Sequence, residues 1–133
     1  MEQSTIKILV VDDEAEFVEL FVKRLQKRSF QVASAQSGQE ALGWLDKNSV
    51  DIVILDIKMP GMNGIETLKE IKKRQPFVEV LILTGHGSIE SSLQGIHHGA
   101  YDCIMKPFDM KDLLYKVQKA YERRQLMLAE KQK

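Results

Sequence analysis

Short apolar runs alternate with amphipathic stretches along most of the chain. The apolar runs cover residues 6–11, 31–35, 50–55, 78–83 and 100–105, the second and the last being weaker. After each run, apolar residues recur three or four positions apart, as they do in a helix that buries one face. These stripes are Phe17, Leu20, Phe21 and Leu25; Ala41, Leu42 and Leu45; Ile65, Leu68 and Ile71; Ile89, Leu93 and Ile96; and Leu113, Leu114, Val117 and Tyr121. The pattern predicts five strands, each followed by a helix.

This alternation predicts a doubly wound α/β fold. Strands that alternate with helices pair in parallel through right-handed crossovers, and near-continuous apolar strands are typical of a sheet covered on both faces. The punctuation agrees, because Ser37, Asn63 and Asp109 stand where helix N-caps are expected. Gly99 stands where the fourth helix should end.

Composition narrows the class of protein. A chain of 133 residues predicts one domain. Its formal net charge is zero, so no global basic surface points to nucleic acid. No apolar run approaches the ~18–20 residues of a membrane span, and the N-terminus has no apolar segment typical of a secretory signal. The single cysteine, Cys103, rules out an internal disulfide and favours a reducing compartment, so we expect a cytoplasmic protein.

The C-terminal stretch differs from the rest. The expected fifth helix continues past residue 122, which divides the chain into a domain of residues 1–122 and an extension of residues 123–133. Residues 109–133 contain seven Lys or Arg and four Asp or Glu. Leu126, Met127 and Leu128 have no evident core to pack on. The extension is either a solvated helix end or the start of a linker or dimerising helix.

Polar residues stand at the carboxyl ends of four predicted strands. Asp12 and Asp13 follow the first strand, Asp56 the third, Thr84 ends the fourth, and Lys106 follows the fifth. In a parallel sheet these ends meet at one edge, which is where α/β proteins bind ligands. We therefore expect the five side chains to converge.

Three of these residues are acids that would repel one another without a cation. A cluster of oxygen ligands suits a hard divalent ion, most simply Mg²⁺. Zinc is disfavoured because no Cys or His stands at ligand spacing. The alternative, that Asp12 and Asp13 only cap the first helix, leaves Asp56 and Lys106 unexplained.

Phosphate chemistry follows from a carboxylate and a metal at such an edge. A carboxylate fixed by a buried strand, as Asp56 would be, can act as a nucleophile and form an acyl phosphate. Positioning and charge neutralisation dominate phosphoryl transfer. Mg²⁺ would neutralise one side of the phosphoryl oxygens and Lys106 another, and the Thr84 hydroxyl would donate a hydrogen bond to a third.

The chain resembles the receiver domain of two-component response regulators. The resemblance covers about residues 7–121 and rests on four motifs in order, at residues 10–14, 55–64, 84–85 and 99–108. It implies a flavodoxin-like (βα)5 fold with a five-stranded parallel sheet in the order 2-1-3-4-5. It further implies that a sensor histidine kinase donates a phosphoryl group to the chain, which assists its own phosphorylation and dephosphorylation without being an enzyme.

The resemblance also assigns residues. Those assigned to the phosphoryl group are Asp56 as acceptor, Thr84 and Lys106. Those assigned to Mg²⁺ are Asp13, Asp56, the backbone carbonyl of Lys58, and Asp12 through water. The family has a cis peptide bond after this lysine, so we predict a cis Lys106–Pro107 bond. Lys58 and His86 flank the acceptor, either as solvated side chains or as residues that tune the lifetime of the phosphoryl group.

One position departs from the family pattern. The family usually has Tyr or Phe three residues before the lysine, where this chain has Cys103, and Tyr101 should point differently. We expect the fourth helix and fifth strand still to respond to phosphorylation, with weaker aromatic gating. Gly95 favours a soft fourth helix, since glycine costs about 1 kcal/mol there relative to alanine. The face of the fourth helix, fifth strand and fifth helix is the expected signalling face, and a homodimer through it stays open.

Two other functions are alternatives to the phospho-receiver. Aspartate-nucleophile phosphohydrolases carry a second acid two residues after the nucleophile, where this chain has Lys58. A phosphorylation-independent interaction module of the same fold normally loses an acid or the lysine, and none is lost here. The output stays open: the chain is either a stand-alone receiver or the amino-terminal piece of a transcription regulator. The 99–108 motif and charged tail look like receivers that precede an ATPase and a DNA-binding domain.

Overall fold

A computed structural model describes residues 5–57, 63–85 and 89–132. The strands are β1 (Lys7–Val11), β2 (Gln31–Ala35), β3 (Ile52–Asp56), β4 (Glu79–Thr84) and β5 (Asp102–Met105). The helices are α1 (Ala15–Gln26), α2 (Gly38–Leu45), α3 (Gly64–Arg74), α4 (Ile89–His97) and α5 (Met110–Lys131). All strand pairs are parallel and the order is β2-β1-β3-β4-β5. The predicted fold class and strand order are confirmed.

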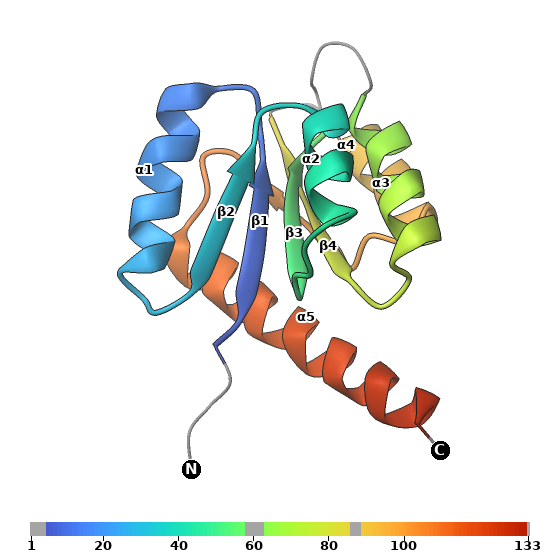
Figure 1. Cartoon of the computed structure of the whole chain (residues 1–133). Helices are drawn as coiled ribbons and strands as arrows, with labels where there is room; N and C mark the ends of the chain where they lie inside the picture. Colours follow the sequence, from blue (N-terminus) through green and yellow to red (C-terminus); the bar gives the residue numbers. More distant parts are fainter. Residues whose placement is uncertain (1–4, 58–62, 86–88, 133) are drawn as a thin grey trace.

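Helices cover both faces of this sheet (Figure 1). α1 and α5 pack over one face, where Phe21, Leu25 and Leu113 belong to one buried cluster. α2, α3 and α4 cover the other face, where Leu45 and Leu68 belong to a second cluster. Every residue of β3 and β4 is buried, as expected for strands enclosed on both sides. The carboxyl ends of these strands are therefore rigid supports for side chains.

Polar caps begin three of the helices as predicted. The Ser37 hydroxyl accepts a hydrogen bond from the backbone N–H of Glu40, and Asp109 accepts one from that of Lys111. Asn63 starts α3 with a reciprocal capping box to Glu66. Such caps satisfy backbone donors that the first helical turn leaves unpaired.

α1 begins differently. Its N-cap is Glu14, whose side chain makes no capping hydrogen bond. Asp12 instead accepts the backbone N–H of Glu14 at 2.9 Å, one residue ahead of the helix. The interpretation of Asp12 and Asp13 as helix caps alone is therefore not what the structure shows.

Three members of the predicted apolar stripes lie outside the core. Leu20 is 64% exposed and Leu93 is 66% exposed, and Ile96 is also exposed. In α1, by contrast, Phe21 and Leu25 pack on the sheet and are buried. Helical periodicity identifies an apolar side, but the sheet covers only part of a broad apolar stripe. The helices that these stripes predicted are confirmed, but these three members of the stripes are exposed.

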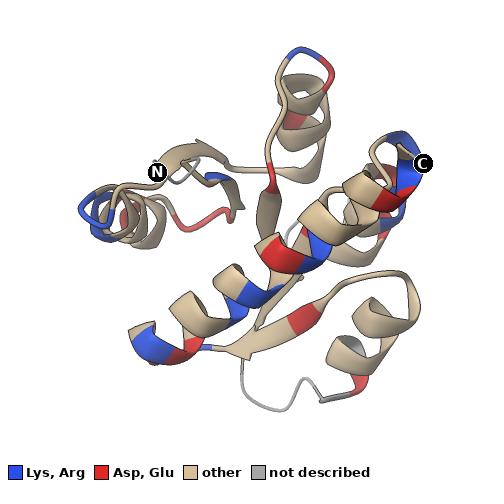
Figure 2. Ribbon diagram, turned by 90° about the horizontal axis from the view of Figure 1, so that it is seen from below, with Lys and Arg blue, Asp and Glu red and all other residues tan. Residues whose placement is uncertain are grey.

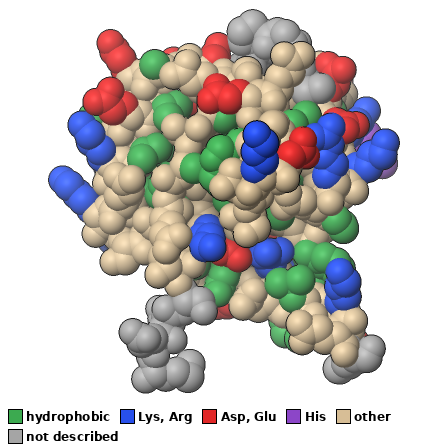
Figure 3. Space-filling view, viewed as in Figure 1, with side chains coloured by type: hydrophobic (Ala, Val, Ile, Leu, Met, Phe, Trp, Pro, Cys, Tyr) green, Lys and Arg blue, Asp and Glu red, His purple; other side chains and the backbone are tan. Residues whose placement is uncertain are grey.

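α5 extends well beyond the sheet (Figure 1). Arg123 lies 2.8 Å from buried Glu79, and Arg124 pairs with Asp51 at 3.0 Å, so both arginines contact the amino-terminal end of the sheet. Seen from below, α5 carries charges of both signs (Figure 2). Past this point Leu126 is exposed, and the space-filling view shows hydrophobic side chains on the projecting end (Figure 3). The domain boundary at residue 122 stays a prediction.

None of the helices in the described part of the chain has the length and hydropathy needed to cross a membrane. The helices are instead amphipathic: in the last turn of α3, Lys73 and Arg74 are exposed, whereas half-buried Lys72 donates hydrogen bonds to the carbonyls of Pro76 and Val78.

Gly64 brings the start of α3 against the end of β3. Its N–H donates to the Ile57 carbonyl at 3.1 Å. A Cβ at this position would meet the Ile57 backbone, lying 2.7 Å from its carbonyl oxygen and 2.8 Å from that of Asp56. The absence of a side chain at Gly64 thus helps to fix the backbone that carries Asp56.

Substituting Gly64→Ala should lower the free energy of unfolding by about 1–3 kcal/mol, because the backbone of β3 must shift to admit the methyl group. Gly43→Ala is the matched control, since among the described residues nothing lies within 4 Å of its Cβ. That change should raise the free energy by about 0.5–1 kcal/mol through helix propensity. Urea denaturation of both variants measures the difference, and equal effects would contradict the close-packing argument.

Candidate functional site

The predicted site residues converge at the carboxyl edge of the sheet. Asp12 follows β1 and is fully buried, and Asp56 ends β3 with only 8% of its surface exposed. Thr84 ends β4 and is buried. The backbone N–H of Lys106 donates to the Thr84 carbonyl at 2.6 Å, which ties the β5–α5 loop to the end of β4.

Three carboxylates form an acidic cluster. Asp12, Asp13 and Asp56 each offer an oxygen, and these oxygens lie within 4.8 Å of one another. Asp13 is exposed, which leaves one side of the cluster open to solvent. An open set of oxygen ligands fits a hard divalent ion that retains several waters. Lys58, whose carbonyl was predicted to complete the ligands, lies outside the described residues, as does His86.

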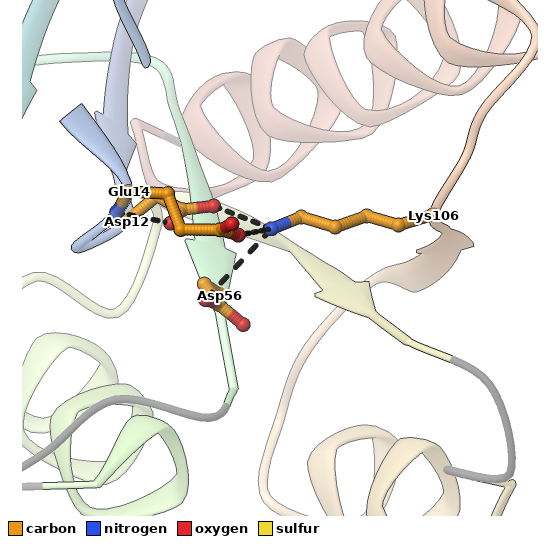
Figure 4. Close-up of polar contacts among 4 residues, drawn as sticks. All are labelled: Asp12, Glu14, Asp56 and Lys106. Atoms are coloured by element: carbon orange, nitrogen blue, oxygen red, sulfur yellow. Dashed lines mark hydrogen bonds and ion pairs between the residues drawn. The ribbon is translucent and has the colours of Figure 1, made fainter. Parts of the chain in front are cut away.

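Lys106 reaches into this cluster from the opposite side (Figure 4). Its Nζ lies 2.7 Å from Asp12 Oδ2, 3.0 Å from Glu14 Oε1 and 3.9 Å from Asp56 Oδ2. The same ammonium lies 4.4 Å from the centre of the Phe17 ring, within the range of a cation–π contact. The predicted cis Lys106–Pro107 bond is confirmed.

Electrostatics keep Lys106 charged. Burial alone lowers the pKa of an ammonium, but the hydrogen bonds to Asp12 and Glu14 and the charge of Asp56 outweigh it, so the pKa of Lys106 is raised above its usual value. Lys106 is therefore the internal counter-ion of the acidic cluster. Its positive charge offsets part of the repulsion among the carboxylates.

Glu14 and Phe17 are contacts of Lys106 that the sequence did not reveal. Glu14 follows the Asp pair directly, but its position at a helix start suggests only a cap or a solvated side chain. Phe17 belongs to an apolar stripe, and a stripe at helical spacing predicts a helix but no contact with a lysine. Its ring does pack, 5.4 Å from Phe21 and 6.2 Å from Phe108, and it also faces the ammonium.

Cys103 and Tyr101 pack on opposite sides of the sheet. Half-buried Cys103 contacts the cluster under α2 and α3, whereas Tyr101 belongs with the cluster under α1 and α5. The Arg123 guanidinium lies 5.2 Å from the Tyr101 ring centre. The expectation that Tyr101 points differently from residue 103 is confirmed.

A groove lies beside Cys103, between α4 and α5. It encloses about 380 Å³ and is lined by Thr84, Ser92, Leu93, Ile96, Cys103, Met105, Asp112 and Lys116. The exposed apolar side chains of α4 and β5 thus lie beside Thr84, a member of the site. The groove therefore connects Thr84, at the carboxyl edge of the sheet, with the exposed surface of α4 and β5.

Comparison with known proteins identifies the family. The model of the response regulator receiver domain matches residues 8–118, most of the chain. A receiver domain protein from Clostridium thermocellum has a solved structure that superimposes with a TM-score of 0.87 at 36% identity, covering 92% of this chain and 98% of that one. The chain belongs to the response regulator receiver domain family of two-component systems.

Several relatives are longer transcriptional regulators. The chain is 38% identical over 120 residues to the transcriptional regulatory protein ZraR of Escherichia coli K12, covering 90% of this chain but 27% of ZraR. It is 43% identical over 111 residues to a CpxR homologue of Haemophilus influenzae, covering 84% of this chain and 48% of that protein. NtrX from Brucella abortus, solved with ADP, superimposes with a TM-score of 0.91 at 33% identity, covering 96% of this chain and 30% of NtrX. The chain thus spans between about a quarter and a half of these proteins.

Removing the counter-ion should destabilise the fold. In buffer without divalent ions, Lys106→Met leaves Asp12 buried beside other carboxylates, so the free energy of unfolding should fall by about 1–3 kcal/mol. Adding Mg²⁺ should recover most of this loss, because a divalent ion would replace the missing positive charge. Urea denaturation with and without Mg²⁺ measures both effects.

Lys23→Met is the control for that experiment. Lys23 pairs with Glu19 at 3.3 Å on the exposed side of α1, where an ion pair contributes little. An equal loss in both variants, or no recovery with Mg²⁺ in Lys106→Met, would contradict the counter-ion assignment.

Proposed function

We propose that this receiver accepts a phosphoryl group on Asp56 in a Mg²⁺-dependent reaction and relays the signal through the α4–β5–α5 face. The observation that carries the proposal is the setting of Asp56. Its carboxylate ends a fully buried strand, shares a 4.8 Å cluster with Asp12 and Asp13, and lies 3.9 Å from the Lys106 ammonium. That arrangement combines a carboxylate nucleophile in a fixed position with the negative charges of Asp12 and Asp13 and the positive charge of Lys106.

In the proposed reaction a phosphoryl group passes from a histidine nitrogen of the donor to a carboxylate oxygen of Asp56. A carboxylate oxygen of Asp56 bonds to the phosphorus of a phosphohistidine, and the P–N bond breaks with its electron pair left on the imidazole nitrogen. The Lys106 ammonium and the Thr84 hydroxyl would stabilise the phosphoryl oxygens. Mg²⁺, held by Asp13, Asp56, the Lys58 carbonyl and, through water, Asp12, would neutralise further phosphoryl charge. In this proposal the chain is a phospho-acceptor that assists its own phosphorylation and dephosphorylation, and it is not an enzyme.

The donor in this proposal is a sensor histidine kinase. A groove of about 430 Å³ borders the site and is lined by Glu14, Phe17, Leu20, Phe21, Arg24, Lys106, Pro107 and Phe108. Leu20 is exposed at its rim. Lys106 lines this groove and its ammonium lies 3.9 Å from Asp56, so a donor protein bound in the groove would bring its phosphohistidine near the acceptor.

The proposed output is regulation of transcription by a longer protein. The relatives named as transcriptional regulators extend well beyond the matched region. In this proposal the receiver itself contacts no nucleic acid, in keeping with its net charge of zero. A cytoplasmic location is part of the proposal and fits the single, unpaired cysteine.

Acetyl phosphate and Mg²⁺ should add one phosphoryl group to the protein, because a small-molecule donor needs only the acceptor and its charges. Asp56→Asn should abolish the adduct, and Asp46→Asn, at an exposed carboxylate in another part of the fold, should retain it. Intact-protein mass spectrometry measures the adduct. A stable protein without adduct would favour the phosphorylation-independent module, and steady release of phosphate from a phosphomonoester would favour the hydrolase.

Phosphorylation should also promote dimerisation through the α4–β5–α5 face, since Leu93, Ile96 and Met105 expose apolar surface there. With Mg²⁺ and beryllofluoride as phosphate mimic, sedimentation velocity should show a shift from monomer to dimer. Leu93→Asp should prevent the shift, whereas Leu20→Asp, an equally exposed leucine on α1, should not. A mimic-bound protein that stays monomeric would contradict dimerisation while leaving the acceptor chemistry intact.

A further inference from the structure

The two shortest ion pairs of Lys106 are with Asp12 and Glu14, and not with the acceptor Asp56. Its ammonium is closer to Glu14, at 3.0 Å, than to Asp56, at 3.9 Å. We propose that Glu14 is a positioning residue that holds Lys106 in a resting place and competes with the phosphoryl group on Asp56 for its ammonium. This inference rests on the proposed function of Asp56 and adds a tuning residue to it.

The close-up view shows that the Lys106 ammonium is approached by carboxylates from two directions (Figure 4). Asp12 and Glu14 approach the ammonium from the loop after β1, and Asp56 approaches it from the end of β3. A phosphoryl group on Asp56 would bring new anionic oxygens on that second side. Lys106 must then give up part of its contact with the first side to bind them.

Glu14 is built to make this contact. Its backbone is fixed, because its N–H donates to Asp12 Oδ1 at 2.9 Å and its carbonyl accepts the N–H of Val18 at 3.0 Å. Its carboxylate makes no capping hydrogen bond to α1, although it occupies the N-cap position. The side chain is therefore directed to Lys106 while its backbone is anchored.

Phe17 supports the same resting place. The ammonium lies 4.4 Å from the ring centre, and Phe21 and Phe108 hold that ring in an aromatic cluster. The carboxylate of Glu14 and the ring of Phe17, one turn along α1, thus attract Lys106 together. The N-cap and first turn of α1 thus form a binding site for Lys106, which lies in the β5–α5 loop.

The strength of the contact suits a tuning role. The Glu14 side chain is 65% exposed, and an ion pair with an exposed partner is weak enough to break when a better partner arrives. Asp12 differs, because it is fully buried and belongs to the acidic cluster. Removing the Glu14 carboxylate should therefore favour the position of the Lys106 ammonium near Asp56, while the acidic cluster stays intact.

The test measures the affinity of the protein for beryllofluoride at a Mg²⁺ concentration that saturates each variant, followed by amide NMR. Glu14→Gln should bind the mimic about twofold to fivefold more tightly, the range expected when an exposed ion pair stops competing. Glu14→Asp should do the same, because it keeps the charge but is one methylene too short to hold the 3.0 Å contact. Glu16→Gln, at an exposed acid in the first turn of α1, should leave the affinity unchanged.

A double-mutant cycle separates competition for Lys106 from a general field effect. In a Lys106→Ala background, Glu14→Gln should have no effect on mimic affinity. The inference is overturned if Glu14→Gln gains less than twofold, if Glu14→Asp behaves as wild type, or if the gain persists without Lys106. Failure of the wild-type protein to bind the mimic or to be phosphorylated would instead refute the proposed function, so the two failures are distinguishable.

Discussion

The structure at the carboxyl edge depends on one ion pair, between the Lys106 ammonium and the buried carboxylate of Asp12, 2.7 Å apart. Two buried acids, Asp12 and Asp56, stand side by side there because β1 pairs directly with β3. A buried carboxylate is costly unless it is paired. The lysine that pairs with it comes from beyond β5, two strands from β3, and strands are spaced about 4.8 Å apart. A long, flexible side chain is therefore needed to cross the end of β4 and reach the acids.

The features that the sequence predicted are those that depend on local patterns or on topology. The caps at Ser37, Asn63 and Asp109 depend on residues within three positions of the cap, so composition and spacing suffice. The convergence of the site follows from parallel pairing alone, since that pairing brings all carboxyl ends to one edge. Strand limits were less accurate: β3 begins at Ile52 and not at residue 50, because the backbone ladder, and not burial, defines a strand.

What the sequence could not predict depends on where a side chain points. Glu14 and Lys106 are 92 positions apart, and their contact follows from the loop before α1 and from the path of the lysine. Leu20 and Leu93 fit helical periodicity, but periodicity does not say how much of the apolar stripe the sheet covers. Gly95 was interpreted as a softening residue in α4. Its Cα faces the Ile82 side chain so closely that a Cβ would collide with it, so close packing is a sufficient reason for glycine there.

A second cluster of charged residues, Glu79, Lys72 and Arg123, lies at the opposite end of the sheet, where the charges hold elements of the fold together. Glu79 is fully buried at the start of β4, and burial raises its pKa, although Arg123 and Lys72 act to lower it. Arg123 lies 2.8 Å from this carboxylate, which fixes α5 to the sheet far from the acceptor. Among the described residues, the cations that pair with this carboxylate are Arg123 and the more distant Lys72, at 4.0 Å.

The two clusters thus impose opposite demands. At the Glu79 end, the partners of the buried acid can stay in place, since nothing there has to exchange. At the Asp56 end, the proposed function requires Lys106 to stabilise Asp12 at rest and yet to be available to a phosphoryl group, and no single position satisfies both. The solution in this chain is a shared ammonium with one tight contact to Asp12, one weak contact to Glu14 and one longer approach to Asp56. In the proposed reaction, a divalent ion that neutralised the charge of Asp12 would free the lysine for the phosphoryl group. Metal binding would then be coupled to reactivity through the same side chain that stabilises the resting fold.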